Sequence, residues 1–182
     1  MQSVSLKMAT GRDFALVLLG SLAISLFGHI SIPLWFTPVP LATQNGAVLL
    51  VALLLGSRRG AAATFAFLSL GAMGLPVLSQ GLGGFALFLG PTGGYLIGYL
   101  IAAYVTGLIA EKKKGFLYAA LALAAGNGII YLLGASYLAT FVGLDRAFAL
   151  GIAPFLIGDA AKFVISLKIA KWAGWKRSAQ CA

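Results

Sequence analysis

The chain has one cysteine and four acidic residues, and both shortages restrict what it can do. The single cysteine, Cys181, excludes an internal disulfide framework and a metal site built from cysteines. An aspartic hydrolase needs two converging carboxylates, and only Asp159 lies well inside a hydrophobic segment. The sequence also lacks a phosphate-binding loop of the form G-x-x-x-x-G-K-[ST], an H-E-x-x-H motif and a nucleophile elbow. These absences argue against an enzyme and against ATP hydrolysis by this chain.

Hydrophobic residues are what the chain has in excess. They make up 60% of its 182 residues, charged residues make up 9%, and the mean hydropathy is +0.99. This balance is typical of a membrane protein and far from that of a soluble domain. The 24 glycines suit helices that pack closely within lipid. We therefore expect an all-α membrane protein that forms a single transmembrane domain over residues 1–182.

Six hydrophobic segments are candidates for membrane-spanning helices. We place them at about residues 14–32, 43–56, 60–73, 94–110, 116–141 and 152–172. Prolines in residues 33–40 prevent the first helix from continuing. Residues 74–94 are rich in glycine and poorly suited to a regular helix, so we expect a long outer loop between the third and fourth helices. The polar N-terminus leads into a segment too long for the core of a signal peptide, so we expect no cleaved signal.

The thirteen basic residues test the number of spans. With six spans and both termini in the cytoplasm, eleven of the thirteen fall in cytoplasmic segments, leaving Arg146 outside and Lys162 within the last span. An odd number of spans would remove this asymmetry. The pattern predicts cytoplasmic N- and C-termini. Topology and anionic membrane lipid then account for the net charge of +9, without a nucleic-acid partner.

The charged pair Asp159 and Lys162 lies inside the last hydrophobic segment. A charged side chain at bilayer depth costs at least ~2.5 kcal/mol, so it rarely persists there without a function or a partner. The i,i+3 spacing places both groups on one face of a helix, where each partly neutralises the other. A structural ion pair is one interpretation. A polar ligand site within the membrane is the interpretation that we prefer.

Further polar residues fall in the outer half of the membrane under this topology. Gln44 and Asn45 open the second segment, while Asn127 and Tyr131 share a face of the fifth at i,i+4 spacing. Each ligand candidate also has a structural interpretation: Asn127 as a contact between helices, Tyr131 as an interfacial aromatic, and Gln44 as a partner for backbone or water. Together these residues predict a binding pocket that faces outward.

Five segments of the chain together resemble the BioY family. They are PVPLATQN (38–45), LLGSRRG (54–60), LGAMGLPVLSQGLGG (70–84), LGPTGGYLIGY (89–99) and PFLIGDAAK (154–162), and the resemblance extends over about residues 14–172. Members of this family are the biotin-specific substrate-binding (S) components of energy-coupling-factor (ECF) transporters. The resemblance implies a six-helix protein of the bacterial cytoplasmic membrane that binds biotin from outside with high affinity and takes part in its uptake.

The resemblance also implies partners. S components are powered by a separate module, made of a transmembrane coupling protein and two cytoplasmic ATPases, so ATP is used there and this chain needs no cofactor. The coupling protein docks on small residues of the first helix. Here Leu19 interrupts that alanine spacing, and Ser21 and Ser25 offer a small pair instead. Alternatives are an S component for another vitamin, an intramembrane enzyme, or an assembly subunit without a ligand.

The chemistry of biotin assigns roles to the polar residues within this resemblance. Biotin carries a ureido ring with two N–H donors and one carbonyl, a thioether ring, and a carboxylate tail. We expect Asp159 to accept the ureido N–H groups and Asn127 or Gln44 to complete that end. Lys162 either neutralises Asp159 or approaches a ligand oxygen.

The glycine-rich loop is expected to cover the apolar part of the ligand, together with Tyr131. Gly83 and Gly84 allow close approach of the backbone, and Phe85 supplies apolar surface. The polar end departs from the family pattern, because Ala42-Thr43-Gln44-Asn45 stands where the family commonly has Thr-x-Gln-Thr.

Overall fold

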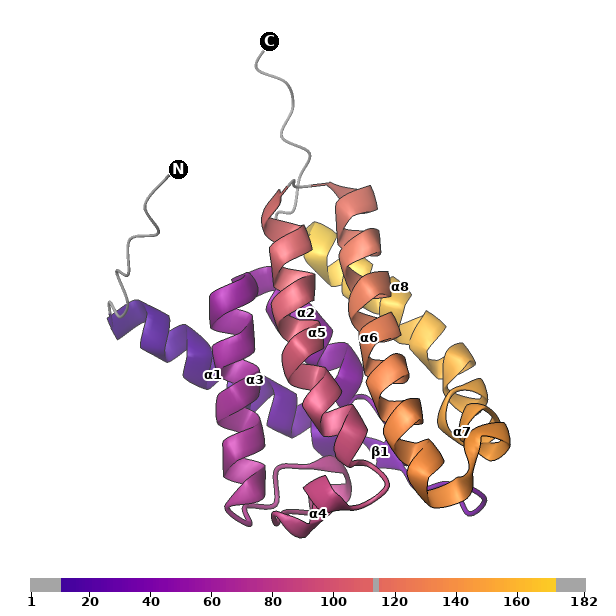
Figure 1. Ribbon diagram of the computed structural model, residues 1–182. Helices are drawn as coiled ribbons and strands as arrows, with labels where there is room; N and C mark the ends of the chain where they lie inside the picture. Colours follow the sequence, from indigo (N-terminus) through magenta and orange to yellow (C-terminus); the bar gives the residue numbers. More distant parts are fainter. Residues whose placement is uncertain (1–10, 113–114, 173–182) are drawn as a thin grey trace, which may run out of the picture.

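The computed structural model describes residues 11–112 and 115–172, and most of these residues are helical (Figure 1). The helices are α1 (Gly11–His29), α2 (Gln44–Leu55), α3 (Ser57–Ala72), α4 (Ala86–Leu89), α5 (Gly93–Lys112), α6 (Phe116–Val142), α7 (Leu144–Gly151) and α8 (Leu156–Trp172). The remaining secondary structure of the described residues consists of two 3-10 turns and two short strands. The turns are η1 (Ser79–Gly81) and η2 (Ala153–Phe155), and the strands are β1 (Ser31–Ile32) and β2 (Leu41–Ala42).

Each of the six predicted hydrophobic segments overlaps one helix, and the ends differ by up to four residues. The six helices are α1, α2, α3, α5, α6 and α8. The all-helical class is therefore confirmed. Among the described residues, α1, α5 and α6 are each long and apolar enough to cross a membrane. A fourth candidate span is a pair of helical segments that is long and apolar enough only when taken together. The pair consists of Leu144–Phe155 and Gly158–Trp172, which are bent by 44° relative to each other. Helix α2 is apolar but has 12 residues, and α3 has 16.

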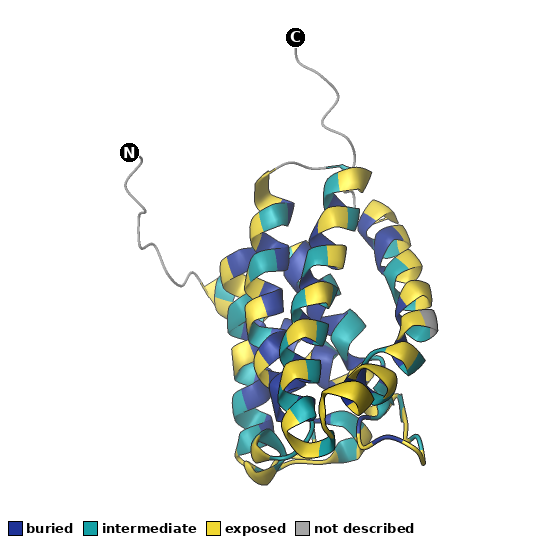
Figure 2. Ribbon diagram, turned by 45° about the vertical axis from the view of Figure 1, so that its right-hand side comes forward, coloured by how far each residue is buried: buried dark blue, intermediate teal, exposed yellow. Residues whose placement is uncertain are grey.

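Helix α5 lies at the centre of the bundle. It packs against α2, α3 and α6, while α1 lies against α3 and α8 lies against α2 and α6. Buried residues occupy the faces that the helices turn toward one another, as Figure 2 shows. Loop 73–92, with the short helix α4, lies at the end of the bundle where α5 begins and α6 ends, at the bottom of Figure 1. We call this the loop end and the opposite end the basic end.

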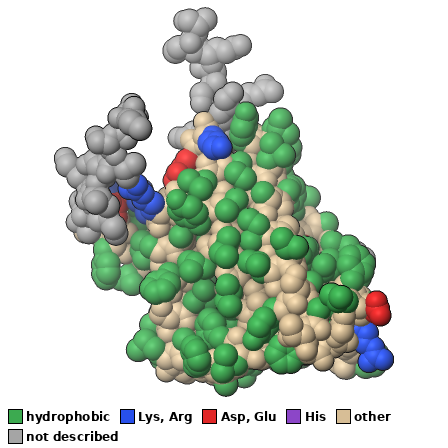
Figure 3. Space-filling model, in the orientation of Figure 1, with side chains coloured by type: hydrophobic (Ala, Val, Ile, Leu, Met, Phe, Trp, Pro, Cys, Tyr) green, Lys and Arg blue, Asp and Glu red, His purple; other side chains and the backbone are tan. Residues whose placement is uncertain are grey.

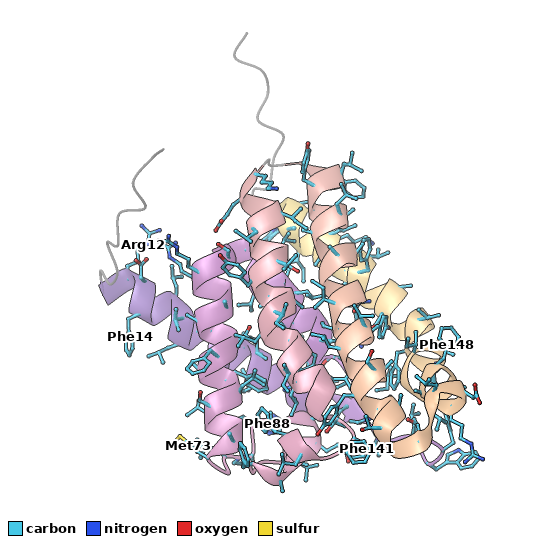
Figure 4. The ribbon with its side chains drawn as sticks, in the orientation of Figure 1. Arg12, Phe14, Met73, Phe88, Phe141 and Phe148 are labelled. Atoms are coloured by element: carbon cyan, nitrogen blue, oxygen red, sulfur yellow. The ribbon has the colours of Figure 1, made fainter. Side chains whose placement is uncertain are left out.

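The outer surface of the bundle is apolar. Figure 3 shows hydrophobic side chains over most of one face, with charged side chains only at its margins. Figure 4 shows Arg12 and Phe14 together at the start of α1, and Met73, Phe88 and Phe141 toward the loop end. Exposure of so continuous an apolar surface is unfavourable in water but favourable in the hydrocarbon core of a membrane. The chain is therefore a multi-pass membrane protein.

Helix α5 crosses the turn between α2 and α3 at van der Waals distance. A Cβ placed on Gly107 would lie 2.3 Å from the Cα and N atoms of Ser57, and 2.5 Å from the carbonyl carbon of Gly56. Those atoms belong to the backbone, so no rotamer change could make room for the added methyl group. By contrast, nothing lies within 4 Å of a Cβ placed on Gly128 of α6. Glycine is a packing requirement at Gly107 and not at Gly128.

Glu111, near the end of α5, caps the first turn of α3. Its carboxylate accepts hydrogen bonds from the backbone N–H of Ser57 at 2.7 Å and from the Ser57 hydroxyl at 2.9 Å. A negative charge at a helix N-terminus also interacts favourably with the helix dipole. We expect Glu111→Ala to lower the free energy of unfolding by about 1 kcal/mol, and Glu111→Gln to lower it less. Thermal unfolding of both variants in detergent measures this, and an unchanged midpoint for Glu111→Ala would contradict the cap.

The small pair predicted on α1 as a docking site is wrong for that purpose. Ser21 and Ser25 are both buried inside this protein, and the Ser25 hydroxyl donates to the Ser21 carbonyl oxygen at 2.9 Å. The same face of α1 packs on α3, because Gly20 lies against Ala63. Leu19, in contrast, is 62% exposed. The serines therefore pack the bundle together, and the exposed face of α1 is the one that carries its leucines.

Candidate functional site

A cavity of about 240 Å³ lies at the loop end. Its walls come from loop 33–40, which connects β1 and β2, and from loop 73–92. The first turn of α2, the first two turns of α5 and α8, and the middle of α6 complete the walls. Its size is close to the lower limit of small-ligand pockets, about 300 Å³. Its lining is mostly apolar, with a cluster of polar side chains contributed by α2, α6 and α8.

Asp159 is the centre of this polar cluster. It lies in the first turn of α8 and is 5% exposed. Asn45 donates to both carboxylate oxygens, at 3.0 and 2.9 Å. Tyr131 and Asn127 of α6 donate to Oδ2, the latter at 3.4 Å, and Lys162 donates to Oδ1 at 2.7 Å. Three helices thus supply donors to one carboxylate, which also benefits from the helix dipole at the start of α8.

Lys162 is equally well satisfied. Its ammonium group donates to Asp159 Oδ1 at 2.7 Å, to Asn45 Oδ1 at 2.9 Å and to the Ala42 carbonyl oxygen at 2.6 Å. An ammonium group has three donors, so every one of them is used. In this arrangement Lys162 neutralises Asp159, which was one of the two roles predicted for it.

The Asp159 carboxylate leaves little room for another donor. An ionised carboxylate offers about four lone-pair sites, and those of Asp159 already receive five hydrogen bonds. A ligand N–H can reach this carboxylate only if one of the present donors, such as Tyr131, moves aside. That Asp159 accepts ligand N–H groups stays a prediction, and the structure adds this condition to it.

Asn127 lies at the back of the polar cluster. It lines a second cavity of about 20 Å³, together with Ser166, whereas the main cavity is lined by Gln44, Tyr131, Asp159 and Lys162. A space of this size holds about one water molecule. The structure therefore brings Asn127 to Asp159 but not to the main cavity wall. Among the described residues, no three His, Cys, Asp or Glu side chains are grouped to hold a metal ion.

Gln44 lines the cavity but uses its amide to hold the loop. It is 1% exposed, its Oε1 accepts from the Ser79 hydroxyl at 2.9 Å, and its Nε2 donates to the Val77 carbonyl at 3.5 Å. The amide also lies against α1, where a Cβ on Gly28 would be 2.7 Å from Nε2. The structural interpretation of Gln44 is thus realised, and its contact with a ligand stays a prediction.

The three loop residues predicted to cover the ligand lie outside the cavity lining. Phe85 is 63% exposed and stacks on Phe88 with ring centroids 6.0 Å apart. A Cβ on Gly83 would lie 2.2 Å from the Leu75 carbonyl oxygen, so this glycine lets the loop pack on itself. Gly84 has φ +119°, which also suits glycine. Their neighbours Leu82, Ala86 and Leu87 line the cavity instead.

Sequence reasoning missed Tyr95 and Tyr99 of α5, which line the cavity. It placed Asn45 at the pocket but gave it no role, whereas the structure shows that Asn45 connects the carboxylate to the ammonium group. The hydroxyl of Tyr95 donates to the Gly151 carbonyl at 2.8 Å and so ties α5 to the end of α7. The two tyrosines are separated by four residues and share a face of α5, a signal that was present in the sequence.

Comparisons with known proteins identify the family of this chain. A family model described as "BioY family" matches residues 2–180. A "Biotin transporter BioY" of Thermotoga maritima is 44% identical over 142 residues, which cover 78% of this chain and 83% of that protein. Another protein of that name, from Rhizobium etli, is 38% identical over 167 residues, covering 85% and 89%.

A solved structure shares the fold as well. It is described as the S-component for biotin from an ECF-type ABC transporter, and it matches with a TM-score of 0.79 and 27% sequence identity. The match covers 91% of this chain and 93% of that one. The family resemblance carried by the five sequence segments is confirmed, and the chain belongs to the BioY family.

Proposed function

We propose that this chain binds biotin in the cavity at the loop end and is the substrate-specific component of an ECF-type biotin transporter. The observation that carries the proposal is the buried, charge-balanced cluster around Asp159 at one side of an apolar cavity, in a chain of the BioY family. The relatives named biotin transporter and the fold shared with an S-component for biotin support it.

The two parts of the cavity suit the two parts of biotin. The ureido ring lies against Asp159, Asn45 and Tyr131, where an incoming N–H replaces one of the present donors to the carboxylate. Exchange of one hydrogen bond for another in a site that excludes water keeps the buried charge satisfied. Leucines of the lining, including Leu82 and Leu87, cover the thioether ring and the alkyl tail. No cofactor is needed for this binding.

The same proposal includes six spans with both termini in the cytoplasm of a bacterium. In this topology the short helices α2 and α3 cross as part of the bundle, and the basic end, with Arg58, Arg59 and Lys112, faces the cytoplasm and anionic lipid. The cavity then opens to the outside of the cytoplasmic membrane. A transmembrane coupling protein and two cytoplasmic ATPases supply the energy, and the exposed leucine face of α1 is available to the coupling protein.

Equilibrium binding of labelled biotin to the purified chain in detergent, without ATP or partners, tests the proposal. We expect saturable binding with a dissociation constant of about 10⁻⁹ to 10⁻⁶ M, the range of specific small-ligand sites. Unlabelled biotin is expected to compete, whereas thiamine and riboflavin are not. Absence of saturable binding would refute the assignment of biotin. Preferential binding of thiamine or riboflavin would reassign the site to that vitamin.

A further inference from the structure

Most polar side chains that line the cavity are already hydrogen-bonded within the protein. Among the described residues, the lining has two polar side chains that form no such bond, the amide of Gln80 and the hydroxyl of Tyr99. Tyr99 is buried, whereas Gln80 is exposed at the loop end. The polar side chains that are already bonded are Gln44, Asn45, Ser79, Thr92, Tyr95, Tyr131, Asp159 and Lys162.

The backbone of Gln80 is held in an unfavourable conformation. Its φ of +64° and ψ of +19° lie in the left-handed region, and among the described residues it is the only non-glycine with positive φ. A glycine would adopt these angles without strain. The conformation is maintained from outside, because the Gln80 N–H donates to the Ser31 hydroxyl at 2.9 Å and the neighbouring Ser79 is bonded to Gln44. Strain that is held in place beside a cavity is typical of functional positions.

The charges of the lining indicate what an exposed donor at this position would bind. Asp159 and Lys162 are the charged side chains among the described lining residues, and they neutralise each other at 2.7 Å. A ligand carboxylate therefore finds no unpaired cation in the cavity wall. It is best placed toward water, where neutral N–H donors complete its hydration. The Gln80 amide has two such donors.

We propose that Gln80 is a specificity-determining residue whose side-chain amide donates to the carboxylate of the bound ligand at the mouth of the cavity. This inference rests on the proposed function, since it concerns the tail of biotin. It explains why a strained glutamine stands directly before Gly81, in a loop where glycine is used at neighbouring positions with positive φ.

The test compares Gln80→Gly and Gln80→Ala with the unchanged protein, using labelled biotin and an analogue whose tail ends in a methyl group. Both variants remove the amide, but only alanine retains the backbone strain. We expect both to weaken biotin binding by about tenfold, the typical effect of losing a hydrogen bond to a charged group. Affinity for the methyl-terminated analogue is expected to stay unchanged. The unfolding midpoint of Gln80→Gly is expected to equal or exceed that of the unchanged protein.

Each other outcome overturns the inference. Unchanged biotin affinity in both variants means that the amide makes no contact. Weakening in Gln80→Ala alone assigns the effect to the backbone conformation. Equal weakening for biotin and the analogue assigns it to the shape of the loop. If the unchanged protein bound no biotin, the proposed function itself would fail. That failure is seen before any variant is compared, so it is distinct from failure of the inference about Gln80.

Discussion

Asp159→Ala is expected to weaken biotin binding by at least ~2 kcal/mol, or about thirtyfold. The substitution removes the acceptor shared by Asn45, Asn127, Tyr131 and Lys162, and it leaves the ammonium group without its counter-ion. Breaking a buried ion pair by removing one partner costs about 3–5 kcal/mol, so the unfolding midpoint is expected to fall as well. Labelled-biotin binding and thermal unfolding in detergent measure the two effects.

Two further variants separate the loss of binding from the loss of folding. The double variant Asp159→Asn, Lys162→Met removes both charges, so it is expected to recover stability relative to Asp159→Ala but not biotin affinity. Asp145→Ala removes an exposed carboxylate of α7 and is expected to leave biotin affinity unchanged. Wild-type affinity in a folded Asp159→Ala protein would eliminate Asp159 as a ligand-binding residue. Recovered affinity in the double variant would do the same.

The second large effect is expected at Gly107. Gly107→Ala places a methyl group against the backbone of Ser57, and forced overpacking of this kind destabilises proteins by about 1–3 kcal/mol. Gly128→Ala is the matched control, because it introduces the same methyl group in α6 where nothing lies within 4 Å. Alanine is the better helix former by about 0.5–1 kcal/mol, so this control is expected to be neutral or stabilising. Thermal unfolding of the two variants side by side measures the difference, and equal midpoints would contradict close packing at Gly107.

The sequence predicted the long helices well because each is a hydrophobic segment with clear limits. It did not predict α7, a short helix of mixed polarity whose sequence, LDRAFALG, is no hydrophobic segment. It also treated residues 152–172 as one continuous helix. The structure instead has the turn η2, which contains Pro154, before α8 begins. A proline at the start of a helix is compatible with either arrangement, so the sequence alone does not distinguish them.

The polar site was predicted in part for a related reason. Asp159, Lys162, Asn127 and Tyr131 converge because they lie at similar depth on helices whose direction follows from the topology. Asn45 was regarded as a departure from the family pattern, because its two-sided contact with the ion pair depends on how α2 packs against α8.

Residues of loop 73–92 could not be assigned to the cavity from sequence. A loop has no regular period, so the side that each residue presents is decided by tertiary contacts. The loop lies beside the cavity, but Leu82 and Leu87 line it in place of Phe85.

The polar cluster also has a consequence for how the protein is made. Helix α8 is the last of the described helices, so α2 and α6, which carry Asn45, Asn127 and Tyr131, are synthesised before it. On its own, α8 would carry the charges of Asp159 and Lys162 deep into the bilayer, each at a cost of about 2.5–3.5 kcal/mol. Earlier helices that already present donors and acceptors lower that barrier at the translocon. Integration of the last described helix is therefore expected to depend on the assembly of those before it, and substitution of Asn45 is expected to lower the yield of integrated protein.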